Sequence, residues 1–182
     1  AYLEALGVGS IFRIHEPPEP QRVVEFEEIA AHFGYPLGVG GLPVKRFPVV
    51  DRKRDGRKIR KDIVLAAELP ITPRHYQNLV AKIAGKPEER VLSYLMLRSL
   101  KQARYSAANT GHFALAAKSY THFTSPIRRY PDLIVHRILS SVLDGRDPPP
   151  AALEPLAMHA SLAERRAAEA ERELVEWKKM KF

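Results

Sequence analysis

The stretch that decides the fold runs from residue 120 to residue 137 and reads YTHFTSPIRRYPDLIVHR. Its first half mixes aromatic and hydroxyl side chains and lacks the apolar spacing of a helix, so we expect strand and loop there, from His112 to Thr124. Its second half begins at Pro131, a residue favoured in the first turn of a helix, and continues with apolar residues three and four positions apart. The pattern therefore predicts a helix that starts at Pro131 and stops at Gly145.

The side chains around this predicted helix start are of the types that proteins use to bind phosphate and nucleic-acid bases. Arg128 and Arg129 lie directly before it, where free backbone amides and the positive end of the helix dipole favour an anion. Tyr120, His122 and Ser125 add rings and hydroxyls, which single-stranded RNA recognition uses for bases and sugars. The residues alone leave an alternative open, in which the aromatic side chains form a buried cluster and the arginines lie on the surface.

Other segments predict a helix-rich α+β chain. Apolar spacing and proline or glycine boundaries indicate helices over residues 21–33, from Thr72 to Gly85 with Pro73 at the first position, and from Pro87 with Val91 on the inner side. After Pro155 a long helix carries small and apolar residues in heptad spacing, which favours a position in the core. This seam consists of Leu156, Ala160, Ala163, Ala167, Ala170, Leu174 and Trp177. We expect residues 1–182 to form a single domain, and the helical character of the first seven residues favours an excised piece of a longer chain.

Positive charge is concentrated in one segment. The chain has 29 Lys and Arg against 21 Asp and Glu, a net charge of +8, and residues 45–61 alone carry nine bases and two acids. Two extended runs around Asp55-Gly56 predict a β-hairpin there. Its bases are candidates for contacts with an RNA backbone, and a flexible, solvated insertion is the alternative. The candidates, called here the hairpin bases, are Arg52, Lys53, Arg54, Arg57 and Lys58.

Composition excludes several classes of protein and site. The 182 residues contain no cysteine, which removes disulfides and thiolate metal sites and fits a reducing cytoplasm. No apolar run approaches the roughly 20 residues of a membrane-spanning helix, so we expect no membrane partner. The seven histidines show no paired ligand spacing, and the carboxylates do not form a metal-binding cluster, so no metal ligand is predicted in this chain.

The stretch at residues 120–137, with GHFAL at 111–115, resembles the signature of the RNase II/RNase R family of 3′-to-5′ exoribonucleases. The flanks agree, with LRSLKQA at 97–103 before it and a segment from His159 to Trp177 after it. The resemblance covers nearly the whole chain, and the residues at 99–103 and 124–132 are most similar to the bacterial RNase R branch. The fold implied is the C-terminal part of an RNB catalytic domain with a long C-terminal helix. The basic hairpin is an insertion that departs from the family.

The resemblance also implies site residues and partners. Arg128 corresponds to the arginine that contacts the terminal phosphates, and Arg129 and Glu171 are expected to line the RNA channel. Magnesium in the full-length enzyme would be held by aspartates that precede Ala1. Cold-shock RNA-binding domains would also precede Ala1. An OB-type domain would follow Phe182, and single-stranded RNA is the expected partner.

The function implied is processive 3′-to-5′ hydrolysis of single-stranded RNA to nucleoside 5′-monophosphates by the full-length enzyme. Because the metal ligands are not expected in residues 1–182, this chain alone is predicted to be inactive. A non-catalytic RNA-binding or assembly module that keeps the RNB fold is the alternative, and a nicked enzyme whose other half co-purifies is a third possibility.

Overall fold

The computed structural model describes residues 2–39, 45–52, 58–65, 71–148 and 152–181, with the backbone alone in the two segments between 45 and 65. The chain forms two compact units, one made of Ala1–Glu16 with Gln102–Phe182 and the other of Pro17–Lys101. Helices dominate the described residues and the strands form two small antiparallel sheets, which confirms the predicted helix-rich α+β class. That all 182 residues belong to one domain stays a prediction.

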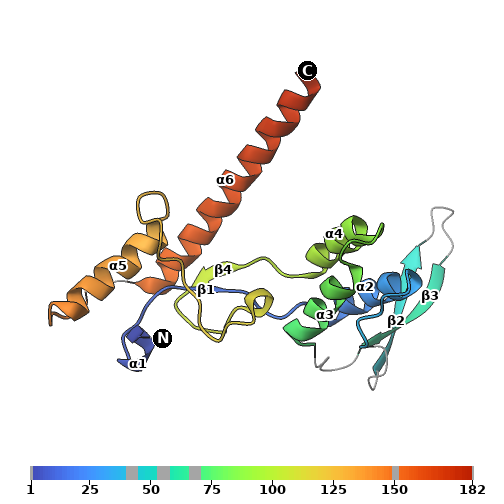
Figure 1. Ribbon diagram of the computed structural model, residues 1–182, viewed down its shortest axis with the longest axis horizontal. Helices are drawn as coiled ribbons and strands as arrows, with labels where there is room; N and C mark the ends of the chain where they lie inside the picture. Colours follow the sequence, from blue (N-terminus) through green and yellow to red (C-terminus); the bar gives the residue numbers. More distant parts are fainter. Residues whose placement is uncertain (1, 40–44, 53–57, 66–70, 149–151, 182) are drawn as a thin grey trace. The chain divides into compact units, whose positions relative to one another are not determined.

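The first unit joins the beginning of the chain to its second half through a short strand pair (Figure 1). Strand β1 pairs antiparallel with β4, and Arg13 lies opposite Tyr105. Sequence-distant strands this short, of three residues each, were not predicted. The elements of this unit are α1 (Tyr2–Ala5), β1 (Phe12–Ile14), β4 (Arg104–Ser106), the 3₁₀ helix η1 (Phe113–Leu115), α5 (Tyr130–Leu143) and α6 (Leu153–Lys181).

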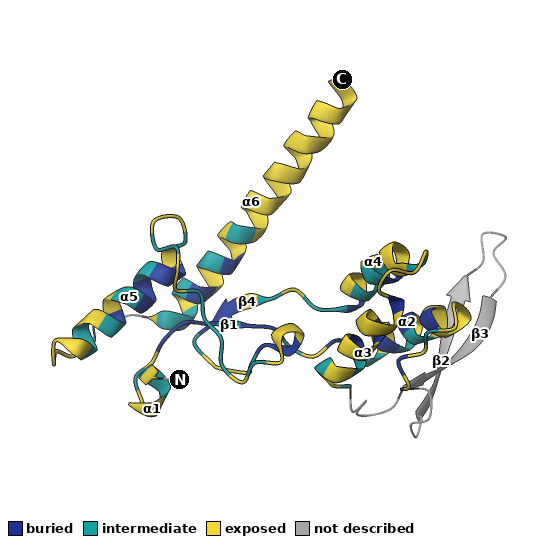
Figure 2. Cartoon of the chain, in the orientation of Figure 1, coloured by how far each residue is buried: buried dark blue, intermediate teal, exposed yellow. Residues whose placement is uncertain are grey.

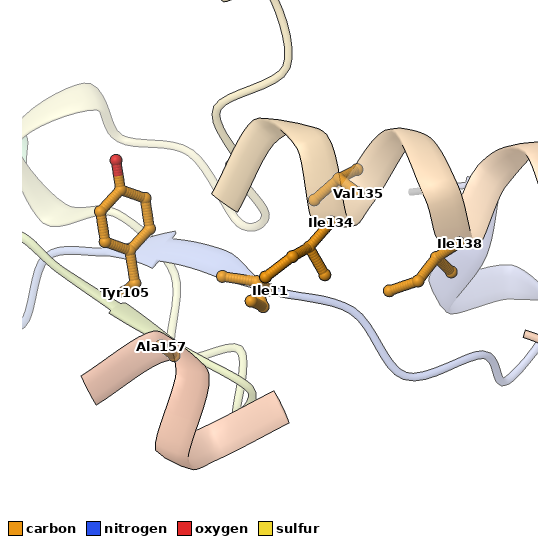
Figure 3. Packing of buried hydrophobic residues seen from close by; sticks show 6 residues of the cluster. All are labelled: Ile11, Tyr105, Ile134, Val135, Ile138 and Ala157. Atoms are coloured by element: carbon orange, nitrogen blue, oxygen red, sulfur yellow. The ribbon is translucent and has the colours of Figure 1, made fainter. Parts of the chain in front are cut away.

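The core of this unit lies where α5 meets the β1–β4 pair and the start of α6 (Figure 3). Ile11, immediately before β1, is fully buried and packs with Ile134 and Ile138, two members of the predicted apolar stripe of α5. Tyr105 from β4 and Ala157 from α6 complete the contact. Burial of these side chains, worth roughly 1.5–3 kcal/mol for each large aliphatic one, fixes α5 and therefore the segment directly before it.

Helix α6 is packed only near its beginning (Figure 2). Ala157 and Ser161 are its buried residues, and every residue from Arg165 to Lys181 is exposed. The prediction that the heptad seam lies in the core is therefore wrong for its C-terminal half in the part of the chain that the structure describes. Among the described residues nothing covers that half of the seam, and side-chain spacing alone does not supply a packing partner.

The second unit is built from three helices and a β-hairpin. Helices α2 and α3 both contact α4, and Phe26 of α2 stacks on Tyr76 of α3 with ring centroids 6.2 Å apart. The hydroxyl of Tyr76 also lies 3.2 Å from that of Ser99, which is buried at the end of α4. The elements are α2 (Pro20–His32), β2 (Lys45–Arg52), β3 (Lys58–Leu65), α3 (Pro73–Ile83) and α4 (Glu89–Ser99).

Local sequence signals place the helix boundaries of this unit well. Pro73 begins α3 as predicted, and the Thr72 amide donates a hydrogen bond of 3.0 Å to Nδ1 of His75, a cap partner that the sequence analysis missed. Helix α4 begins two residues after the expected Pro87. Val91, expected on its inner side, is 50% exposed, so that assignment is wrong.

The predicted basic hairpin is present in the backbone. Strands β2 and β3 pair antiparallel from Lys45 opposite Leu65 to Arg52 opposite Lys58. Of the hairpin bases, Lys53, Arg54 and Arg57 lie outside the described residues. Arg52 and Lys58 therefore form the last described pair of the two strands.

Candidate functional site

The two adjacent arginines sit on a tight turn that leads into α5. The backbone amides of Arg128 and Arg129 both donate to the carbonyl of Ser125, at 3.2 and 3.0 Å. Pro131 lies in the first turn of the helix, as its fixed φ and missing N–H allow. The turn is therefore closed on itself before the helix begins, and it presents Arg128 from a defined backbone position.

A buried carboxylate fastens this turn to α5. Asp132 is fully buried, and its Oδ2 accepts hydrogen bonds from the Ser125 amide at 2.9 Å and from Arg129 Nε and Nη2 at 3.1 and 2.8 Å. A carboxylate out of water needs such partners, because an unpaired buried charge is strongly destabilising. Arg129 Nη2 also reaches Thr124 Oγ1 at 3.3 Å. One residue of α5 thus holds both ends of the turn.

Arg128 and Arg129 therefore have different environments. The guanidinium of Arg129 is neutralised by Asp132, and the Arg129 side chain is 22% exposed. That of Arg128 is exposed and has no ion-pair or hydrogen-bond partner among the described residues. Arg129 is therefore paired with a neighbouring carboxylate, and the fork of Arg128 is open to a ligand. The roles of both arginines toward RNA stay predictions.

A second contact fixes the beginning of the same segment. The rings of Phe123 and His136 stack with centroids 4.0 Å apart and an interplanar angle of 5°. His136 Nε2 donates to the carbonyl of Phe123 at 2.7 Å. Neither residue was a predicted site residue, and their role is to hold residues 123–129 against α5.

The other predicted RNA-binding residues of this region contact one another. The ring of Tyr120 lies edge-on to His112 and His122, with centroids 5.2 and 5.7 Å apart. His122 Nδ1 lies 2.8 Å from the hydroxyl of Tyr105. Tyr120 and His122 are partly buried, and Ser125 contributes its amide to Asp132. Their contact with RNA stays a prediction.

Burial lowers the pKa of two histidines of this cluster, His122 and His112, and so favours their neutral forms. It lowers the pKa of His122, and the nearby positive charges of Arg129 and Arg13 lower it further. The pKa of His112 is lowered by burial first and then by His15, whose ring stacks on it at 5.1 Å. A neutral imidazole can accept a hydrogen bond, as His112 Nδ1 does from the Leu115 amide at 3.3 Å.

An ion pair that the sequence analysis missed joins β1 to α6. Arg13 Nη1 donates to Glu164 Oε2 at 2.5 Å, and its guanidinium lies 4.7 Å from the centre of the Tyr105 ring. Glu171, the acidic residue predicted to line the channel, lies further along α6 and is exposed. No hydrogen bond or ion pair connects it to the Arg128 turn in the described part of the chain, so its role stays a prediction.

The described residues do not offer a magnesium site. No three His, Cys, Asp or Glu side chains come together as ligands among them. Likewise, within the described ranges no helix is long and apolar enough to cross a membrane. The site that the structure does build is therefore the open guanidinium of Arg128 on a turn fixed by Asp132.

Comparison with known proteins gives consistent matches. Residues 1–145 match the family model described as RNB domain. Ribonuclease R 1 of Lactococcus lactis is 40% identical over 187 residues, and ribonuclease R of Escherichia coli is 33% identical over 194 residues. Each alignment covers 100% of this chain and 20% of the relative, so the chain spans about a fifth of the length of these curated relatives.

Solved structures share the fold. RNase R of Mycoplasma genitalium in complex with ribose-methylated single-stranded RNA matches with a TM-score of 0.70 at 21% identity, over 97% of this chain and 24% of that one. Yeast Ssd1, described as a pseudonuclease, matches with a TM-score of 0.60 at 24% identity, over 88% of this chain and 16% of that one. With the family model covering most of the sequence, these matches show that the chain belongs to the RNB domain family.

Proposed function

We propose that residues 1–182 form part of the catalytic domain of a 3′-to-5′ exoribonuclease that hydrolyses single-stranded RNA processively to nucleoside 5′-monophosphates. The observation that carries the proposal is the open guanidinium of Arg128, held on a fixed turn in a chain of the RNB domain family. The names of the relatives support the activity, and a fold neighbour bound to single-stranded RNA supports the substrate.

Arg128 is the residue of this chain that we assign to the reacting phosphate. A guanidinium presents a planar pair of donors that matches two phosphate oxygens, and such donors are most effective when the protein positions them in advance. Arg129 lies next to it but uses Nε and Nη2 on Asp132. The contact with the terminal phosphates is therefore assigned to Arg128 and not shared equally between the two.

Other residues extend the contact with RNA in this proposal. Tyr120, His122, Ser125 and Arg129 flank the Arg128 turn, and Glu171 lines the channel from α6. The hairpin bases bind the RNA backbone through their charge. In the full-length enzyme, flanking OB-type domains guide single-stranded RNA to the catalytic domain, and the enzyme acts in the cytoplasm.

Magnesium supplies the main charge stabilisation for phosphodiester hydrolysis in this proposal. The described residues do not fit a site for it, so its ligands belong to the other part of the catalytic domain. What this chain contributes is the orientation of the phosphate by Arg128.

A non-catalytic RNA-binding module is the second candidate. The shared fold of yeast Ssd1, a protein described as a pseudonuclease, supports it, because the same architecture occurs in that protein. A binding module would need the positive charge of Arg128 and the hairpin but no orientation of a reacting phosphate.

A chimera tests the two candidates. Residues 1–182 replace the matching 187 residues of Lactococcus lactis ribonuclease R 1, and the unmodified relative is measured alongside. The substrate is a single-stranded RNA labelled at its 5′ end in one assay and at its 3′ end in another. We expect immediate release of the 3′ label as a mononucleotide, with the 5′ label retained until the RNA is short. A folded chimera that binds RNA and releases nothing, while the unmodified relative is active, would support the binding module.

A further inference from the structure

The buried carboxylate of Asp132, which fastens the turn that carries Arg128, has no part yet in the proposed reaction. Asp132 has no exposed surface, although charged residues are almost never fully buried unless they are paired. All three of its hydrogen-bond donors come from the turn itself, namely the amide of Ser125 and two nitrogens of Arg129. Among the described residues, its hydrogen bonds therefore all go to the segment before α5.

The geometry points to Asp132 as a positioning residue for Arg128, an inference that rests on the proposed function. Ser125 and Arg129 are the two ends of the turn, and Arg128 lies between them. Asp132 Oδ2 binds the backbone amide of Ser125 at one end and the side chain of Arg129 at the other, so it opposes displacement of the turn that carries Arg128. Arg129 then acts as the second half of this anchor, and its contact with RNA is secondary.

The anchor also determines which arginine carries free charge. Pairing with Asp132 neutralises Arg129 and leaves the positive charge of the turn on Arg128. Without the carboxylate, two adjacent guanidinium groups would compete for the same phosphate in more than one orientation. A misplacement of about 1 Å can lower a rate on the order of a hundredfold, whereas long-range attraction barely depends on it. Removal of the anchor should therefore reduce turnover and spare RNA affinity.

The fixed position of α5 makes the anchor rigid. Ile134 and Ile138, on the same helix as Asp132, pack on the fully buried Ile11. Asp132 Oδ1 is buried and has no hydrogen-bond partner among the described residues. Oδ2 therefore accepts all the hydrogen bonds that hold the turn. Asparagine has nearly the same volume and can still accept from the Ser125 amide, but it lacks the charge that holds Arg129.

The test is a double-mutant cycle in the ribonuclease R chimera. Asp132→Asn is measured alone and together with Arg128→Ala, and turnover and RNA dissociation constants are determined separately. We expect Asp132→Asn to lower kcat on the order of a hundredfold with Arg128 present, and to have almost no effect on kcat when Arg128 is already alanine. Equal losses in both backgrounds would overturn the inference, because Asp132 would then act independently of Arg128.

Control variants separate positioning from stability. Ser161→Ala removes another buried hydrogen-bonding side chain of the same unit, which accepts from the Tyr105 amide, and should lower stability without lowering kcat. Arg129→Met removes the other half of the anchor from its partly exposed side, so if Asp132→Asn does not fold, this variant takes its place in the cycle. A loss of kcat in Ser161→Ala as large as in the anchor variants would refute positioning as the cause.

A measurement without catalysis distinguishes this inference from the proposed function. In the isolated chain, the backbone order parameter of Arg128 should be near 0.85 and should fall below about 0.6 in Asp132→Asn. An order parameter that stays high would overturn the inference even if the chimera is an active nuclease. If the order parameter falls but the unsubstituted chimera releases no nucleotide, the anchor stands and the proposed function fails.

Discussion

Replacement of Arg128 by lysine should lower the catalytic rate, whereas replacement of Arg129 by lysine should mainly lower stability. The two residues are adjacent and chemically identical, so each substitution is the matched control for the other. Lysine keeps the charge and loses the planar fork. The structure distinguishes them because Arg129 is bound to Asp132, whereas Arg128 is open to a ligand.

The expected magnitudes follow from these contacts. Arg129 donates twice to a buried carboxylate and lysine can restore one of the two bonds, so Arg129→Lys loses one charge-assisted hydrogen bond, worth about 1.5–3 kcal/mol. Because the side chain is 22% exposed, the lower end of that range applies, which corresponds to a decrease in Tm of about 3–8 °C. Arg128→Lys changes an exposed side chain and should alter stability by less than about 0.5 kcal/mol.

For kcat, the larger loss is expected for Arg128→Lys and the smaller one for Arg129→Lys. Loss of one oriented donor to the transition state typically costs on the order of a hundredfold in kcat, and this is expected for Arg128→Lys with little change in RNA affinity. Arg129→Lys keeps the ion pair that holds the turn and should lower kcat much less. Tm is measured for both variants of the isolated chain, and the single-turnover rate and RNA dissociation constant are measured for both variants of the chimera.

Two results would refute the reasoning. Equal losses of rate in both variants would mean that the structure does not distinguish the arginines. A fall in RNA affinity as large as the fall in rate for Arg128→Lys would mean that Arg128 contributes ordinary binding energy and does not orient a reacting phosphate.

Three further predictions concern the chain as a whole. The isolated chain should not degrade RNA, because its described residues form no metal site to supply the charge that phosphodiester hydrolysis needs; magnesium-dependent release of mononucleotides from pure chain would contradict this. Replacement of the hairpin bases with serine should flatten the salt dependence of single-stranded RNA binding by roughly 0.7 in log–log slope per lost phosphate contact, and an unchanged slope and affinity would assign them to solvent. The free energy of unfolding in urea should decrease between pH 7.5 and pH 5.5, because burial lowers the folded-state pKa of His122 below its ordinary 6.5 and the unfolded chain therefore binds more protons in this range. His122→Gln should reduce this pH dependence, and an undiminished dependence would show that another group causes it.

Local chemistry in the sequence was sufficient to predict most helices. Pro73 and Pro131 each lie in the first turn of the helix that they were expected to begin. Both restrict φ to helical values and need no hydrogen-bond acceptor, so this signal does not depend on the rest of the fold. The pairing of β2 with β3 was predictable for a similar reason, since Asp-Gly between two extended runs is a local hairpin signal.

Features that depend on distant parts of the chain could not be predicted. The pairing of β1 with β4 joins residues about ninety positions apart through strands too short to show an alternating pattern. The C-terminal half of α6 was predicted to be buried and is exposed. A regular apolar stripe predicts burial only where another part of the protein packs against it.

The site was predicted in type but not in detail. The residues indicated an anion-binding turn, and the family resemblance indicated Arg128. The spacing of Arg129 and Asp132, three residues apart at a helix start, was a usable signal for their pairing. That Asp132 is completely buried depends on how α5 packs against Ile11, and no local pattern contains that information.

The exposed end of α6 also gives the chain a built-in optical probe. Trp177 is its single tryptophan, lies within the unpacked part of the helix and is 48% exposed. The ammonium of Lys181, on the same helix, lies 4.3 Å from the ring centre. The indole is therefore in contact with solvent and with this cation. Its fluorescence should show the red-shifted emission of a hydrated indole and strong quenching by acrylamide. Any macromolecule that covers this end of the helix would shift the emission to the blue and reduce the quenching, without a label or a substitution.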